Sequence, residues 1–146
     1  MGERDRIPMV CVVDDDAPLR RALQRLLRSV GFTVETFGSA EDYLAVERKR
    51  APDCLVLDIR LGVLTGFDLY DRLLASGLSV PAIFITGHDD ATTRERAQRL
   101  GAAGYVRKPF DESDLISAIE RALARRAAPS DGPRNGESVG DGGGGG

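Results

Sequence analysis

Several short apolar runs in this sequence end in residues whose types could do chemistry together. In chain order these residues are Asp14, Asp15, Asp58, Thr86 and Lys108. Clustered carboxylates repel one another unless a hard cation neutralises them, and Mg²⁺ takes oxygen ligands in octahedral geometry. A hydroxyl and an ammonium beside such a cluster can contact phosphoryl oxygens and neutralise the charge that develops in phosphoryl transfer. The residue types therefore indicate a Mg²⁺ site that receives a phosphoryl group.

Asp58 is the candidate nucleophile of this set. It has no carboxylate beside it in sequence, whereas Asp14 and Asp15 adjoin each other. A carboxylate can attack phosphorus and form an aspartyl phosphate. Each residue alone is as readily explained as a turn, a helix cap or a solvated side chain. Their order along the chain, each at the end of a strand, makes the set specific.

Alternating strands and helices would position these residues. The uninterrupted apolar run 54–57 is typical of a strand buried on both faces of a parallel sheet. Residues 18–30 have apolar side chains at helical spacing. By the same criteria we expect strands at 9–13, 32–37, 54–57, 80–85 and 104–106, and helices at 18–30, 39–50, 67–76, 91–100 and 111–127.

This alternation predicts an α/β fold of the flavodoxin-like (βα)5 type, a doubly wound parallel sheet with strand order 2-1-3-4-5. In that order the first and third strands are neighbours, and ligands bind beyond their carboxyl ends. Asp14, Asp15 and Asp58 would therefore meet in one cleft.

Length and composition fit one domain. The chain has 146 residues, 42% of them hydrophobic, and a net charge of -3, which gives no argument for nucleic-acid binding. The sequence contains no apolar run of about 18 residues, which a membrane-spanning helix would need. The charged N-terminus is unlike a signal peptide, so we expect a cytoplasmic protein.

We expect a short extension at 1–6, a folded domain at 7–128 and a disordered Gly-rich tail at 129–146. Cys11 and Cys54 are expected to be free and buried.

The site residues together resemble the receiver domain of two-component response regulators, the CheY-like family. The resemblance covers residues 7–127 and rests on Asp14-Asp15, Asp58, Thr86 and Lys108-Pro109, each at a strand end. Within that family, Asp58-Ile59-Arg60 and Ile85-Thr86-Gly87-His88 resemble the FixJ type most.

The resemblance implies that Asp58 accepts a phosphoryl group from a sensor histidine kinase or phosphotransfer protein, or from acetyl phosphate. It implies that Asp15, Asp58 and the backbone carbonyl of Arg60 bind Mg²⁺ directly, with Mn²⁺ as an alternative, and that Asp14 acts mainly through water. Thr86 and Lys108 would contact the phosphoryl group. Such a domain catalyses only its own phosphorylation and dephosphorylation, so we expect no enzyme acting on a separate substrate.

The resemblance also implies a switch. Tyr105 would turn inward as Thr86 moves towards the phosphate, and the Lys108–Pro109 bond would be cis. Arg60 and His88 would influence how long the phosphate survives. The surface formed by residues 91–100, 104–106 and 111–127 would contact an unknown downstream protein, or a second copy of the chain after phosphorylation. No direct contact with nucleic acid or membrane is expected.

One position departs from the family pattern. Leu61-Gly62 stands where receivers commonly have Met-Pro, while Gly66 later in the same loop matches. Gly62 removes the fixed φ of proline and would loosen a loop that offers a metal ligand. We therefore expect lower metal affinity but intact chemistry.

Several alternatives stay open. A Gly-rich tail where FixJ-type regulators continue into a helix-turn-helix favours a single-domain regulator over the receiver fragment of a transcription regulator. A pseudo-receiver that does not turn over phosphate is the second alternative. A haloacid-dehalogenase-type phosphatase would need Asp-x-Asp after its first strand, and Asp58-Ile59-Arg60 lacks the second acid. A nucleotide or flavin binder would need a Gly-rich loop after the first strand, where Asp14-Asp15-Asp16 stands instead.

Overall fold

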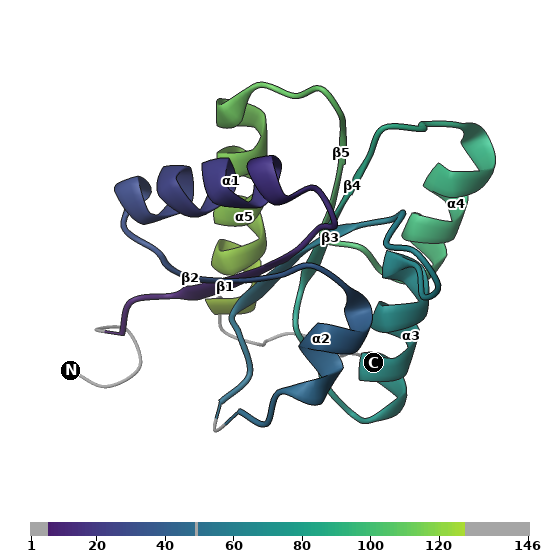
Figure 1. Ribbon diagram of the computed structural model, residues 1–146, viewed down its shortest axis with the longest axis horizontal. Helices are drawn as coiled ribbons and strands as arrows, with labels where there is room; N and C mark the ends of the chain where they lie inside the picture. Colours follow the sequence, from purple (N-terminus) through teal and green to yellow (C-terminus); the bar gives the residue numbers. More distant parts are fainter. Residues whose placement is uncertain (1–5, 49, 128–146) are drawn as a thin grey trace, which may run out of the picture.

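Five strands form one parallel sheet in the computed structural model, which describes residues 6–48 and 50–127 (Figure 1). The strand order β2-β1-β3-β4-β5 confirms the flavodoxin-like fold. The expected tail at 129–146 and most of the expected extension at 1–6 lie outside the described residues. In chain order the elements are β1 (Met9–Val13), α1 (Ala17–Val30), β2 (Thr33–Phe37), α2 (Ala40–Ala45), β3 (Cys54–Asp58), α3 (Gly66–Ala75), β4 (Ala82–Thr86), α4 (Ala91–Arg99), β5 (Gly104–Arg107) and α5 (Glu112–Ala127).

Both faces of the sheet are covered, so the central strands are apolar throughout. Helices α1 and α5 pack on one face, and α2, α3 and α4 lie on the other (Figure 1). Every residue of β3 and β4 is buried. Because successive strand side chains point to opposite faces, Leu57 packs in the core below α3 and Val56 in the core below α1 and α5. Cys11 and Cys54 are free and buried in different cores, as expected.

Local signals explain where the helices next to the carboxyl edge begin. The side chain of Asp16 accepts a hydrogen bond from the Leu19 amide and caps α1. Thr65 and Asp68 form a capping box at the start of α3, which the sequence reading did not identify. These caps hold the first turns of α1 and α3 beside the ends of β1 and β3.

The second helix is much shorter than predicted. We expected it to continue to Arg50, but α2 ends at Ala45 and the backbone of Val46 is extended. Arg48 instead lies over the ring of Tyr43, 3.9 Å from its centroid, and donates a hydrogen bond to the Tyr43 carbonyl at 3.0 Å. The prediction was wrong because the basic side chain stacks on an aromatic ring rather than extending the helix.

Helix α4 is the most weakly packed helix of the second face. Of its residues only Ala97 is buried, in agreement with the sparse apolar positions seen in the sequence. The guanidinium of Arg96 in α4 lies 4.8 Å from the ring centroid of Phe67 and 3.8 Å from Asp71, both in α3, so it links the two helices. Within the described part of the chain, no helix is long and apolar enough to cross a membrane.

Candidate functional site

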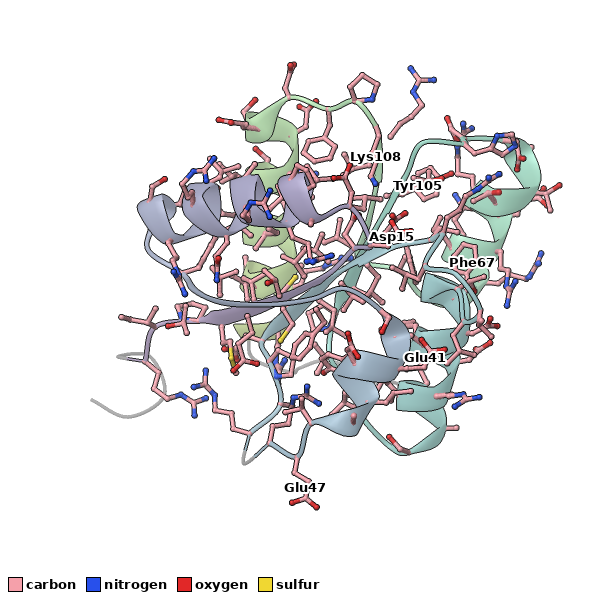
Figure 2. All side chains as sticks on the ribbon, in the orientation of Figure 1. Asp15, Glu41, Glu47, Phe67, Tyr105 and Lys108 are labelled. Carbon is pink, nitrogen blue, oxygen red and sulfur yellow. The ribbon has the colours of Figure 1, made fainter. Side chains whose placement is uncertain are left out.

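Three carboxylates meet at the carboxyl edge of the sheet. Asp14 and Asp15 follow β1 and Asp58 ends β3, its parallel neighbour. One carboxylate oxygen of each residue lies within 4.8 Å of those of the others. Figure 2 labels Asp15 and Lys108 beside the ends of the strands. The structure thus brings together the acids that the sequence predicted to converge.

The Lys108 ammonium bridges the two buried acids. Its Nζ lies 3.0 Å from Asp14 Oδ2 and 3.2 Å from Asp58 Oδ2. Asp14 is 0% and Asp58 4% exposed, whereas Asp15 is open to solvent. Burial alone would lower the pKa of Lys108, but its hydrogen bonds and attraction to both carboxylates raise it. The ammonium therefore stays charged beside the acids.

Burial and the neighbouring Asp14 charge raise the pKa of Asp58 from an ordinary value of 3.8 to about 6. Lys108 and the amide of Arg60, which donates to Asp58 Oδ1 at 3.1 Å, act in the opposite direction. At neutral pH the carboxylate is thus mostly ionised but poorly solvated. A poorly solvated carboxylate close to a cation is suited to act as a nucleophile.

The donor set fits a hard divalent cation. Carboxylate oxygens are the ligands that Mg²⁺ prefers, and it binds through one or two of them while keeping several waters. Three acids with one open to solvent offer that arrangement. The amide of Arg60 donates a hydrogen bond to Asp58 Oδ1, and Arg60 is exposed to solvent.

Thr86 reaches the same edge, but its hydroxyl is engaged locally. It ends β4 beside β3 and is buried. Its Oγ1 accepts a hydrogen bond from the His88 amide at 3.0 Å and donates one to the His88 carbonyl at 3.1 Å. The His88 imidazole is 64% exposed and lies 3.2 Å from Asp90. Thr86 is therefore next to the acids in the sheet, and its hydroxyl is paired with the loop that follows.

Tyr105 is half-buried and tied to a residue that the sequence reading did not single out. Its hydroxyl donates a hydrogen bond to Asp89 Oδ1 at 3.0 Å. Burial and this hydrogen bond raise the pKa of Tyr105 to about 12. Asp89 also pairs with Arg94 at 2.7 Å and with Arg107 at 3.7 Å. No local pattern marks Asp89, because its contact with Tyr105 joins strand β5 to the loop after β4.

The loops around the acids contain two special backbone positions and one cis bond. The Lys108–Pro109 bond is cis, as the resemblance implied. Gly62 has a φ of 99°, which the ring of proline cannot adopt. A Cβ at Gly66 would lie 2.4 Å from the Asp58 carbonyl oxygen, so only glycine allows α3 to start this close to the acid. Val63, between these glycines, is 90% exposed.

Comparisons with known proteins agree with this geometry. The family model described as "Response regulator receiver domain" matches residues 10–120. Nodulation protein W of Bradyrhizobium diazoefficiens is 42% identical over 117 residues, covering 80% of this chain and 52% of that protein. Transcriptional regulatory protein FixJ of the same organism is 36% identical over 121 residues, covering 83% and 58%.

The solved structures include close matches to the fold. The crystal structure of a response regulator receiver protein from Burkholderia phymatum superposes with a TM-score of 0.72 and is 43% identical, covering 80% of this chain and 95% of that one. The chain spans about half the length of the curated relatives reported above.

Proposed function

The chain belongs to the response regulator receiver domain family, and on that premise we propose that it accepts a phosphoryl group on Asp58 in a Mg²⁺-dependent reaction. The observation that supports this most is the contact of the buried Asp58 carboxylate with the Lys108 ammonium. An oxygen of the same carboxylate lies within 4.8 Å of carboxylate oxygens of Asp14 and Asp15. Receiver domains act with histidine kinases in two-component systems, and we propose that a sensor histidine kinase is the phosphodonor of this chain.

In the proposed reaction an oxygen of Asp58 attacks the phosphorus of a phosphohistidine or of acetyl phosphate. A P–O bond to Asp58 forms while the bond to the leaving group breaks, and the electron pair goes to the leaving nitrogen or oxygen. Asp58 is mostly ionised at neutral pH and so needs no general base. Lys108 neutralises negative charge on the transferring group. Thr86 would contact a phosphoryl oxygen after giving up its hydrogen bonds to His88.

Asp15, Asp58 and the Arg60 carbonyl would hold Mg²⁺ directly, and Asp14 would act through water. The bound ion supplies positive charge that offsets the carboxylates and the phosphoryl oxygens. Its affinity would reflect the loop at Gly62, whose positive φ replaces the fixed backbone of proline. Mn²⁺ takes similar oxygen ligands and would serve as an alternative.

The phosphodonor protein would dock beside Lys108. A groove of about 430 Å³ lies between α1 and the start of α5, and apolar side chains line most of it. Its lining includes Leu19, Leu26, Pro109 and Phe110. Because the groove adjoins the ammonium that contacts Asp58, a helix of a histidine kinase or phosphotransfer protein seated there would lie close to the acceptor.

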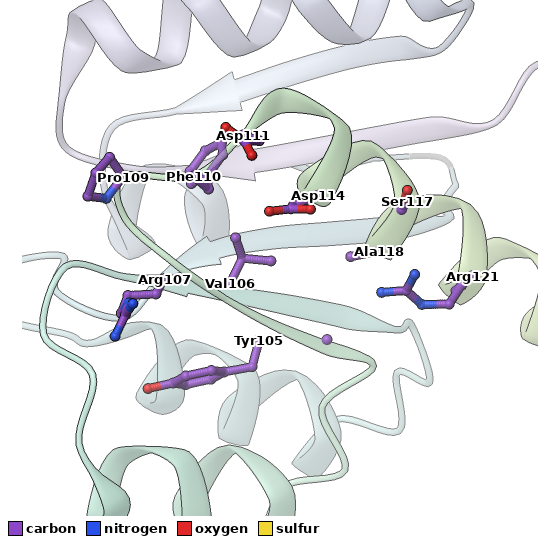
Figure 3. Close-up of a pocket in the computed structure, with 11 residues that line it drawn as sticks. Tyr105, Val106, Arg107, Pro109, Phe110, Asp111, Asp114, Ser117, Ala118 and Arg121 are labelled. Atoms are coloured by element: carbon purple, nitrogen blue, oxygen red, sulfur yellow. The ribbon is translucent and has the colours of Figure 1, made fainter.

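The output would pass through α4, β5 and α5. A second groove of about 560 Å³ runs between β5 and α5 (Figure 3). Both signs of charge line it, from Arg107, Arg121, Asp111 and Asp114. In a two-fold interface the same patch meets itself, so mixed charges can pair across it. This groove therefore suits a second copy of the chain or a downstream protein of mixed charge.

Intact mass spectrometry tests the acceptor. The full chain is incubated with acetyl phosphate and Mg²⁺, beside a chelated sample and the variants Asp58→Ala and Asp42→Ala, the latter an exposed acid of α2. We expect one added phosphoryl group in wild type and Asp42→Ala only, and none after chelation. A folded wild type that gains no mass from acetyl phosphate or from histidine-kinase donors would establish a pseudo-receiver instead.

A further inference from the structure

The guanidinium of Arg20 in α1 contacts the backbone of the segment that carries Asp14 and Asp15. Nη1 of Arg20 donates a hydrogen bond to the Asp14 carbonyl oxygen at 2.7 Å. The amide of Arg20 donates to the Asp16 carbonyl oxygen at 2.9 Å. Arg20 therefore contacts the segment between β1 and α1 on both sides of Asp15, through its side chain at Asp14 and through its amide at Asp16.

Asp14 is anchored at each of its polar atoms. Its amide donates to the Phe37 carbonyl at 3.0 Å, and its carbonyl accepts from Arg20. Its Oδ1 accepts from the Asp16 amide at 2.9 Å, and its Oδ2 from Lys108 at 3.0 Å. Because Asp14 is fully buried, losing any of these donors leaves an acceptor that water cannot readily reach. Two of these donors, Arg20 and Lys108, are long cationic side chains, and of the two it is Arg20 that contacts the backbone.

Gly38 makes room for that cation. A Cβ at position 38 would lie 3.1 Å from Arg20 Nη1, 3.4 Å from Cζ and 3.6 Å from Nη2. The nearest atoms are thus all in the guanidinium. Gly38 is not among the glycines with positive φ, so its backbone would accept another residue, and the Arg20 guanidinium would have to shift by a few tenths of an ångström to admit a Cβ there. The space beside Gly38 is thus filled by the same guanidinium that contacts the Asp14 carbonyl.

Arg20 and Lys108 place positive charge at the site in different ways. Lys108 contacts the carboxylate oxygens themselves, where it competes for the atoms that a metal would use. Arg20 contacts a backbone carbonyl, so this contact occupies none of the carboxylate oxygens. A cation placed this way orients metal ligands without displacing the metal.

We propose that Arg20, in the space left by Gly38, is a positioning residue for the divalent cation: it fixes the backbone at Asp14 so that the carboxylates of Asp14 and Asp15 face Asp58. This inference rests on the proposed Mg²⁺-dependent function. Residues that orient metal ligands without touching the metal typically change its affinity by about 10–100-fold when they are replaced.

Calorimetric titration of the full chain with Mg²⁺ measures this effect. The variants are Arg20→Gln, Arg20→Lys and Gly38→Ala, and the matched control is Arg21→Gln, which removes the same charge from an exposed neighbour on α1. We expect about a tenfold loss of affinity in Arg20→Gln, a smaller loss in Arg20→Lys and Gly38→Ala, and wild-type affinity in Arg21→Gln. The Asp16 amide resonance of the metal-free chain should shift in Arg20→Gln and Gly38→Ala but not in Arg21→Gln.

The outcomes separate this inference from the proposed function. Equal Mg²⁺ affinity and an unmoved Asp16 resonance in Arg20→Gln and Arg21→Gln would overturn the role of Arg20 while the proposed function stands. A folded wild type that binds no Mg²⁺ would overturn both. If Arg20→Gln does not fold, Gly38→Ala decides, since it keeps the cation and displaces it: weaker binding supports the proposal and unchanged binding refutes it.

Discussion

Replacing Asp58 by asparagine should stabilise the metal-free protein at neutral pH. The Asp58 carboxylate is buried beside Asp14, and both effects raise its pKa to about 6. Asparagine has a similar shape, keeps an acceptor for the Arg60 amide and carries no charge. Lys108 would retain its ion pair with Asp14. The variant therefore removes the cost of an ionised carboxylate in this cluster.

The size of the effect follows from the pKa. In the unfolded chain Asp58 loses its proton near the ordinary value of 3.8, and in the folded chain only near 6. Between these values the folded state binds more protons at Asp58, so the contribution of Asp58 to wild-type stability is greatest below about pH 4 and falls as the pH rises to 6. Each pKa unit corresponds to about 1.4 kcal/mol. Allowing for solvent screening at the open side of the cluster, we expect Asp58→Asn to be more stable by about 1–3 kcal/mol above pH 6.

Urea unfolding followed by circular dichroism at pH 4.5 and pH 7.5 measures this difference. We expect Asp58→Asn to exceed wild type clearly at pH 7.5 and to approach it at pH 4.5. A gain of this kind raises the unfolding temperature by roughly 3–5 °C per kcal/mol for a domain of this size. Asp42→Asn, which removes an exposed acid of α2, is the control. An Asp58→Asn advantage that is the same at both pH values would refute the reasoning.

Saturating Mg²⁺ should reduce the same advantage. A ligand that binds only the folded state stabilises it in proportion to the logarithm of its concentration over its Kd. Wild type keeps all three acids, whereas Asp58→Asn lacks one of them, so wild type should gain more. An equal gain in both proteins would show that Asp58 is not a metal ligand.

Three further changes test other contacts. Gly66→Ala should lower the free energy of unfolding by at least about 2 kcal/mol, measured by urea unfolding, because its Cβ would lie 2.4 Å from the backbone oxygen of Asp58. Asp89→Ala should lower the pKa of Tyr105 from about 12, measured by ¹³C NMR of the ring, because the nearby negative charge that accepts a hydrogen bond from the Tyr105 hydroxyl is lost; an unchanged pKa would contradict this. Arg96→Ala should speed amide hydrogen exchange in α4 more than in α5, because the cation holds α4 to α3; equal rates before and after the change would argue against that anchorage.

The elements next to the carboxyl edge were predictable because their signals are local. An unbroken apolar run such as 54–57 indicates a buried strand by itself, and the helical spacing in 18–30 indicates α1 by itself. The end of α2 was not predictable in this way. It depends on Arg48 stacking on Tyr43, and that side chain also lies 5.5 Å from the ring of Phe37 in β2. Phe37 lies outside residues 39–50, so no pattern within that segment contains the contact between Arg48 and Phe37.

The sequence by itself determined the order of the strands and therefore which polar residues arrive at one edge of the sheet. Parallel topology places every strand's carboxyl end on the same side, so Asp14, Asp58 and Lys108 meet although 94 residues separate the first from the last. Only the tertiary structure decided the raised pKa of Asp58 and the local pairing of the Thr86 hydroxyl. Desolvation, charge coupling and hydrogen bonding depend on distances through space, and residue spacing along the chain does not encode them.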